Sequence, residues 1–255
     1  MGRVIFVSAG PGAADLITLR GARALQQAEV VLFDALTDPA LRELAPQAQW
    51  LDVGKRGFCD STAQTAIDAL LVKMARRHPM VVRLKGGDAS VFGRLEEELQ
   101  ALAAAGIPQD CIEVVPGVTA AIAAAAQTRR PLTRRGTGRS VSLTTAMTRE
   151  GDLQAARSAD TEVFYMAGRQ LAALARKLLE AGWTPDTPCS VVSRAGWPDA
   201  LASEHAVSGL AAAALLHRGR PTVVTVGAGA RAVAPCPVKS TGIERPQALV
   251  KTLSD

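Results

Sequence analysis

Short apolar runs that lead through a turn into a helical pattern recur along the first half of this chain. Residues 4–7 and 30–33 are apolar throughout, which is typical of strands that are covered on both faces. Strand, turn and helix alternate five times through residue 128. This alternation favours a parallel sheet with helices on its faces and therefore predicts an α/β fold.

The alternation stops at a segment rich in arginine, proline and glycine, with five arginines between residues 129 and 139. Strand patterns restart at residue 140. We therefore predict two α/β domains, residues 1–133 and 134–235, with a ligand cleft between them. A polar tail, residues 236–255, is expected to be poorly ordered.

Composition narrows the classes of function. Aromatic residues make up only 4% of the chain and the formal net charge is +5, which disfavours nucleic acid as a partner. No uncharged apolar run reaches the length of about 18 residues that a membrane span needs. The four cysteines are far apart and unpaired with histidines, so no metal site is expected. A strand begins at residue 3 and leaves no room for a signal peptide, which favours the reducing cytoplasm.

The segment 81–94 is the strongest candidate for a ligand-binding turn. A strand expected to be buried, residues 81–85, runs into Gly86, Gly87 and Asp88, at the strand end where open α/β folds bind ligands. Adjacent glycines let a backbone approach a ligand closely, because no Cβ intervenes. A tight strand-to-helix turn without a ligand has the same pattern, so the residues alone leave both interpretations open. The turn Gly10-Pro11-Gly12 is similar, and it matches neither a dinucleotide fingerprint nor a phosphate loop.

Several motifs together resemble one family. The segment 83–94 reads R-L-K-G-G-D-A-S-V-F-G-R, residues 53–56 read V-G-K-R, and residues 116–121 read P-G-V-T-A-A. With the turn at residues 10–12, they are similar to the signatures of the tetrapyrrole methylases, over roughly residues 3–230. Several positions depart from the family pattern, among them Ala35 in place of arginine, Ala89-Ser90 in place of Pro-Phe, Arg134 in place of histidine, and Thr144-Thr145-Ala146 in place of T-G-H.

The resemblance implies a two-domain class III methyltransferase fold and a reaction. The implied cofactor is S-adenosylmethionine, with S-adenosylhomocysteine as product, and the implied reaction methylates two pyrrole rings of uroporphyrinogen III to give precorrin-2, on the route to sirohaem or cobalamin. A small-molecule tetrapyrrole and a second copy of the chain in a homodimer are the implied partners. Two alternatives stay open: a methylase of a later precorrin, and a non-catalytic paralogue that binds the cofactor or a tetrapyrrole.

The resemblance also implies roles for particular residues. Asp34 is the implied proton acceptor and Lys55 the implied proton donor. The plainer interpretations are that Asp34 caps the N-terminus of a helix and that the side chain of Lys55 is simply solvated. Arg94, Arg134 and Arg135 are expected to bind substrate carboxylates, since guanidinium groups pair with them bidentately. The residues implied to hold the cofactor are Gly10, Pro11, Gly12, Gly86, Gly87, Asp88, Val91, Thr119, Ala120, Met166 and Ala195.

Overall fold

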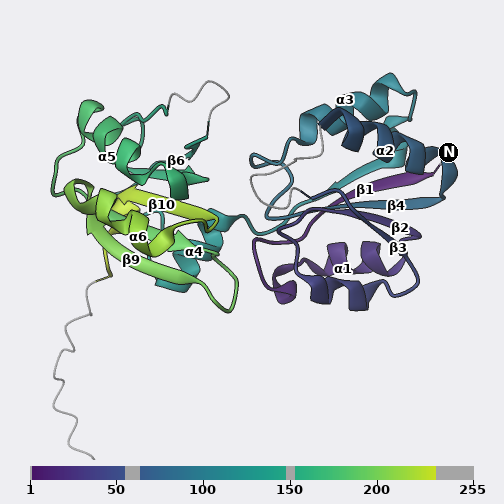
Figure 1. Cartoon of the computed structure of the whole chain (residues 1–255), viewed down its shortest axis with the longest axis horizontal. Coiled ribbons are helices and arrows are strands. Elements are labelled where there is room, and N and C mark those ends of the chain that lie inside the picture. Colours follow the sequence, from purple (N-terminus) through teal and green to yellow (C-terminus); the bar gives the residue numbers. More distant parts are fainter. Residues whose placement is uncertain (1, 55–63, 148–152, 234–255) are drawn as a thin grey trace, which may run out of the picture.

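Two five-stranded sheets, each covered by its own helices, divide the chain into two domains that lie side by side (Figure 1). The structure is a computed structural model, and it describes residues 2–54, 64–147 and 153–233. Lys55 and the predicted tail at residues 236–255 lie outside the described residues. Among the helices of the described part, not one has the length and apolar character needed to cross a membrane.

The first sheet is parallel throughout, with the strand order β3-β2-β4-β1-β5. Its parallel arrangement confirms the prediction drawn from the alternation of strands and helices. The elements of this half are β1 (Arg3–Ser8), α1 (Leu19–Gln26), β2 (Val30–Phe33), β3 (Gln49–Asp52), α2 (Gln64–Arg77), β4 (Met80–Lys85), α3 (Leu95–Ala104) and β5 (Ile112–Val115).

Side chains of β1 alternate between two cores on opposite faces of this sheet. Val4 and Phe6 pack with residues of α2 and α3, whereas Ile5 and Val7 pack on the side of α1. Figure 1 shows α1 below the sheet and α2 and α3 above it. Because successive strand residues point to opposite faces, a strand covered on both sides must be apolar at every position, as residues 4–7 are.

The second sheet is mixed, with the order β6-β7-β10-β8-β9. Strands β6 and β7 are parallel, and the other neighbours are antiparallel. Its helices α5 and α6 share one core with inward-facing residues such as Phe164 and Val224. The elements are α4 (Ala120–Thr128), β6 (Val141–Thr145), β7 (Thr161–Tyr165), α5 (Leu171–Glu180), β8 (Pro188–Ser193), β9 (Leu201–Ala206), α6 (Ala213–His217) and β10 (Thr222–Gly227).

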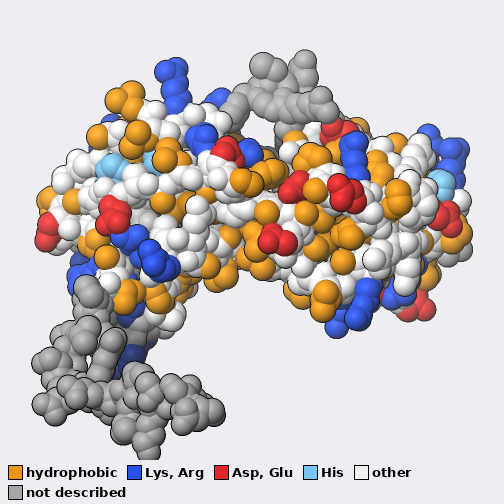
Figure 2. Space-filling view, turned by 90° about the horizontal axis from the view of Figure 1, so that it is seen from below, with side chains coloured by type: hydrophobic (Ala, Val, Ile, Leu, Met, Phe, Trp, Pro, Cys, Tyr) orange, Lys and Arg blue, Asp and Glu red, His pale blue; other side chains and the backbone are white. Residues whose placement is uncertain are grey.

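Helix α4 packs on the second sheet, although the sequence placed it in the first domain. Ala121 lies against Val163 and Val223, and Ala124 lies against Val192. Because the apolar face of α4 is buried on β7, β8 and β10, we propose that the domains divide near Thr119 rather than after residue 133. Figure 2 shows the resulting two lobes with a narrower waist between them.

Candidate functional site

The two glycine turns predicted as binding elements lie against each other. The amide of Gly10 donates to the carbonyl oxygen of Gly87 (3.1 Å), and the amide of Gly87 donates to the carbonyl oxygen of Gly10 (2.7 Å). Both residues have positive φ, 81° and 72°, a conformation that glycine adopts without strain. The ends of β1 and β4 are therefore joined into one rigid edge at the carboxyl side of the first sheet.

Asp88 links this edge to the turn that follows β5. Its Oδ2 accepts a hydrogen bond from the amide of Gly117 (2.8 Å), and its Oδ1 accepts from the amide (2.8 Å) and the hydroxyl of Ser90. Partial burial alone would raise the pKa of Asp88, but these hydrogen bonds outweigh burial and lower its pKa. The carboxylate is therefore ionised at neutral pH and links the turn after β4 to the turn after β5.

The second domain supplies the facing wall through residues at the ends of β7 and β8. The hydroxyl of Tyr165 lies 2.8 Å from Oγ1 of Thr119, and its ring packs against Phe92 at 5.0 Å between centroids. Phe92, Met166 and Arg194 all have positive φ although none is glycine. Such conformations are costly and persist where surrounding structure imposes them, often at functional sites.

The two domains meet directly beside this wall. The amide of Ala13 donates across the domains to the carbonyl oxygen of Gly196 (2.8 Å), and within the second domain the amide of Gly196 donates to Oε1 of Gln127 on α4 (3.4 Å). A Cβ on Gly12 would lie 2.3 Å from the carbonyl carbon of Gly196. Glycine at position 12 is therefore required for the turn after β1 to dock on the turn after β8.

A cavity of about 190 Å³ opens between the domains at this contact. Nine of the eleven residues predicted to hold a cofactor line it: Pro11, Gly86, Gly87, Asp88, Val91, Thr119, Ala120, Met166 and Ala195. Gly10 and Gly12 are not on its surface; they support it through the contacts described above. The structure thus brings the predicted residues of both halves to one place, and their contact with a cofactor stays a prediction.

Asp34 lies at the carboxyl end of β2, next to β4. Its amide donates to the carbonyl oxygen of Leu84 (3.3 Å), and its Oδ1 accepts a hydrogen bond from Arg83 (2.6 Å). Two residues further on, Leu36 lines the cavity. Asp34 itself does not line the cavity, so its role as proton acceptor stays a prediction, and Lys55, its predicted acid partner, lies outside the described residues.

The three arginines predicted to bind substrate do not line the cavity. Arg94 immediately precedes α3 as its N-cap residue, and its guanidinium pairs with Glu97 (3.0 Å). Arg134 opens the turn at residues 134–138, and its side chain donates to the carbonyl oxygen of Arg231. Arg135 is exposed in the same turn. A carboxylate clamp at these residues therefore stays a prediction, and for Arg134 it competes with a contact inside the second domain.

Nine further residues of the cavity were not predicted from the sequence, among them Phe92, Tyr165, Arg194 and Trp197. Arg194 stacks on Trp197, with 4.3 Å from its guanidinium carbon to the ring centroid, and pairs with Asp199 (2.8 Å). Phe92 directly follows the predicted residue Val91, and Tyr165 directly precedes the predicted residue Met166. Their nearness to predicted residues was the signal in the sequence that could have found them. Arg194 and Trp197 flank Ala195 in the same way.

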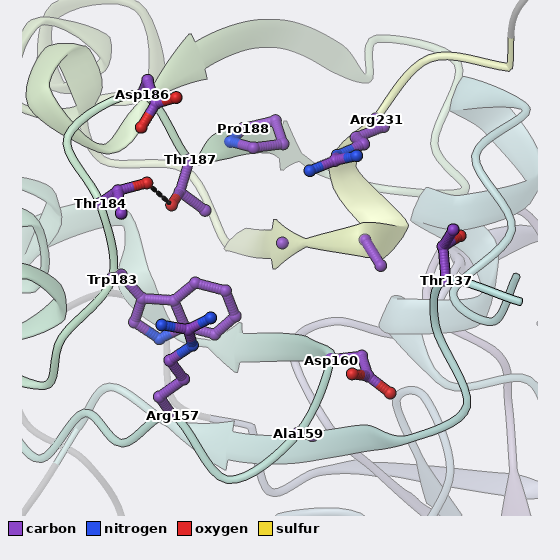
Figure 3. Close-up of a pocket in the computed structure, with 12 residues that line it drawn as sticks. Thr137, Arg157, Ala159, Asp160, Trp183, Thr184, Asp186, Thr187, Pro188 and Arg231 are labelled. Atoms are coloured by element: carbon purple, nitrogen blue, oxygen red, sulfur yellow. Dashed lines mark hydrogen bonds between the residues drawn. The ribbon is translucent and has the colours of Figure 1, made fainter.

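A second cavity, of about 290 Å³, lies within the second domain (Figure 3). Its polar side chains have partners of their own: Arg157 lies over the ring of Trp183, and Thr184 pairs with Thr187. Asp160 accepts hydrogen bonds from the amides of Arg139 and Ser140. None of the described residues that the sequence predicted as site residues lines this cavity, so the cavity between the domains is the better candidate.

The cavity between the domains suits a cofactor such as S-adenosylmethionine. A Cβ added to Gly87 would meet nothing within 4 Å, so bare backbone faces open space there. The charged residues of the lining are Asp88 and Arg194, and the charge of Arg194 is balanced by Asp199. The ionised Asp88 therefore leaves a negative charge that favours a sulfonium, while aromatic and apolar side chains suit the face of an adenine ring.

Residues 3–229 match the family model described as Tetrapyrrole (Corrin/Porphyrin) Methylases. A curated relative, the uroporphyrinogen-III C-methyltransferase of Pseudomonas aeruginosa, is 44% identical over 198 residues, which cover 76% of this chain and 80% of that protein. Siroheme synthase 1 of Yersinia pseudotuberculosis is 44% identical over 200 residues, and the chain spans only 42% of that longer protein.

A solved structure shows the same architecture. The crystal structure of uroporphyrin-III C-methyl transferase from Thermus thermophilus, complexed with S-adenyl homocysteine, superposes with a TM-score of 0.77 at 36% identity. The match covers 89% of this chain and 97% of that one. The predicted class III methyltransferase fold with two α/β domains is thereby confirmed.

Proposed function

Because this chain belongs to the tetrapyrrole methylases, we propose that it transfers methyl groups from S-adenosylmethionine to two pyrrole-ring carbons of uroporphyrinogen III, giving precorrin-2. The names of its relatives support this choice of substrate. One observation carries the proposal: nine residues predicted to hold the cofactor, drawn from both halves of the chain, line one cavity between the domains.

S-adenosylmethionine supplies a methyl group that is already activated as a sulfonium, so the main contribution of the chain is orientation. The bridge between Gly10 and Gly87 fixes one side of the cavity, and the docking of Ala13 on Gly196 fixes the distance to the other. The carboxylate of Asp88 places negative charge on the wall, where a bound cation is stabilised.

The transfer step leaves a proton to be removed. The electron pair of a ring carbon forms the new bond to the methyl group as the electron pair of the breaking S–CH₃ bond stays on sulfur. The ring then carries an extra positive charge, which is lost when a proton passes to a base. We assign Asp34 as that base, because it directly follows β2 at the carboxyl edge of the first sheet, two residues before Leu36 of the cavity wall, and its side chain is 31% exposed. Lys55 is retained as the proposed proton donor.

We further propose a homodimer acting in the cytoplasm. Leu215, on α6, is 86% exposed and Leu19, on α1, is 77% exposed, and large apolar side chains of this kind often mark protein interfaces. Light scattering during gel filtration measures the mass of the protein in solution, which should be that of two chains. Cys111 and Cys189 are free thiols, as suits a reducing compartment.

An anaerobic assay tests the reaction directly. The native chain, S-adenosylmethionine and enzymatically prepared uroporphyrinogen III are incubated together, and the product is followed by mass. The proposal predicts the gain of two methyl groups. Cofactor binding without methyl transfer would refute it and would direct attention to a later precorrin as substrate, or to a binding protein without turnover.

A further inference from the structure

We infer that Arg83 is a positioning residue for the proton acceptor Asp34, and that Glu98 and Lys85 hold Arg83 in place for this purpose. The inference rests on the proposed function, since it concerns the same site. It adds three residues, each buried in the first domain and none on the cavity wall, to the residues that determine the rate of methyl transfer.

These side chains form a continuous line of alternating charge from the core of the first domain to Asp34 at the carboxyl end of β2. Nη2 of Arg83 lies 2.6 Å from Oδ1 of Asp34 and 3.0 Å from Oε1 of Glu98, and Nζ of Lys85 lies 2.7 Å from the same Oε1. The side chains of Arg83, Lys85 and Glu98 are at most 2% exposed, whereas that of Asp34 is 31% exposed. Only the last member of the line reaches the solvent side.

The guanidinium of Arg83 has no freedom to turn. Its Nε donates to both carboxylate oxygens of Glu98 (3.2 and 3.1 Å), and its Nη1 donates to the carbonyl oxygens of Leu84 (3.0 Å) and Leu32 (3.4 Å). Because the guanidinium is planar and is held by Glu98 and by two carbonyl oxygens, its Nη2 can point in only one direction. Oδ1 of Asp34 is held by that donor, which assigns Oδ2 as the atom that receives the ring proton.

Stability alone does not explain this arrangement. Burying charges is costly, and well-packed apolar residues often replace a buried ion pair without loss of stability. The same face of the sheet is otherwise apolar, with Val81 and Leu102 in its core. The charged residues Arg83 and Lys85 lie instead at the carboxyl end of β4, directly before the glycine turn that lines the cavity. The series of ion pairs ends on Asp34, the residue assigned as the base.

The test is a double-mutant cycle between position 83 and Asp34. Arg83→Lys keeps the charge but removes the planar fork. We expect kcat to fall about tenfold or more, because small misplacements of a catalytic group are costly, while KM for uroporphyrinogen III and Kd for S-adenosylhomocysteine stay within about twofold. In the Asp34→Asn background, Arg83→Lys should cause no further loss, since Arg83 acts through the carboxylate.

A second variant and a control keep the test decisive. Glu98→Gln removes the charge that anchors Arg83 and should show the same pattern, so it serves if Arg83→Lys does not fold, as judged by circular dichroism. Arg3→Lys is the matched control: Arg3 pairs with Glu113 (2.6 Å) on the same sheet, but on the solvent side, and kcat should not change.

The outcomes separate the two proposals. Suppose the native chain methylates uroporphyrinogen III, but each variant lowers kcat by the same factor in the native background and in the Asp34→Asn background. The positioning role is then refuted and the proposed function stands. An unchanged kcat in both folded variants refutes it equally. If the native chain transfers no methyl group, the proposed function fails and the inference fails with it.

Discussion

Asp88→Ala should weaken cofactor binding while the domains remain folded. The carboxylate of Asp88 accepts hydrogen bonds from the amides of Gly117 and Ser90 (both 2.8 Å) and from the hydroxyl of Ser90. Its removal leaves two main-chain amides without their acceptor at the wall of the cavity. The glycine turn then loses its link to the turn after β5, and the negative charge facing the cavity is lost.

The size of the effect follows from these contacts. A hydrogen bond to a charged group contributes about 1.5–3 kcal/mol. Asp88 is partly exposed, so water replaces part of what is lost, and screening reduces the value of its charge. We expect a net loss of about 1.4 kcal/mol in cofactor binding, which corresponds to a Kd about tenfold higher.

Calorimetric titration with S-adenosylmethionine measures this change, with Asp160→Ala as the matched control. Asp160 also accepts hydrogen bonds from two amides and a serine hydroxyl, those of Arg139 and Ser140, but it faces the second cavity (Figure 3). Its replacement should leave the Kd unchanged. An unaltered Kd in folded Asp88→Ala, or an equal rise in both variants, would remove the glycine turn from the cofactor site.

Three further outcomes follow from contacts at and near the site. Gly12→Ala should abolish cofactor binding by calorimetry, because its Cβ would lie 2.3 Å from the carbonyl carbon of Gly196 and force the domains apart; retained binding would contradict this docking. Tyr165→Phe, which loses the 2.8 Å hydrogen bond to Thr119, should raise the Kd about fivefold, for a loss of about 1 kcal/mol. Burial lowers the pKa of His217 below its ordinary 6.5, so the unfolded chain binds the proton more readily. The Tm should therefore fall as the pH drops below about 6.5, and His217→Gln should flatten this slope in thermal melts; a slope unchanged in that variant would exclude His217 as its cause.

The strands of the first domain could be predicted closely because their apolar runs are local signals. The apolar runs at residues 4–7 and 30–33 lie within β1 and β2. Strand β9 (Leu201–Ala206) was not predicted, since its sequence LASEHA has no apolar alternation and most of its residues are partly exposed. Pairing with β8 creates that strand, and such tertiary pairing leaves no local pattern.

The site was predictable where its residues sit in motifs and not where they meet across the fold. Gly87 and Asp88 could be recognised from the glycine turn, whereas Tyr165 and Trp197 join the cavity only because the second domain docks on the first. Likewise, a lone Arg83 in a strand gives no hint of its buried pairing with Glu98 on α3. Contacts of this kind depend on how helices and sheets pack.

The central claim is that the cavity between the domains holds the methyl donor, and blocking each cavity in turn tests it most directly. Ala120 lies in the first turn of α4 and lines the cavity between the domains, whereas Thr137 lines the cavity within the second domain. Calorimetric titration of S-adenosylhomocysteine should show no binding to Ala120→Phe and unchanged binding to Thr137→Phe. Undiminished binding to folded Ala120→Phe, with binding lost in Thr137→Phe, would contradict the account.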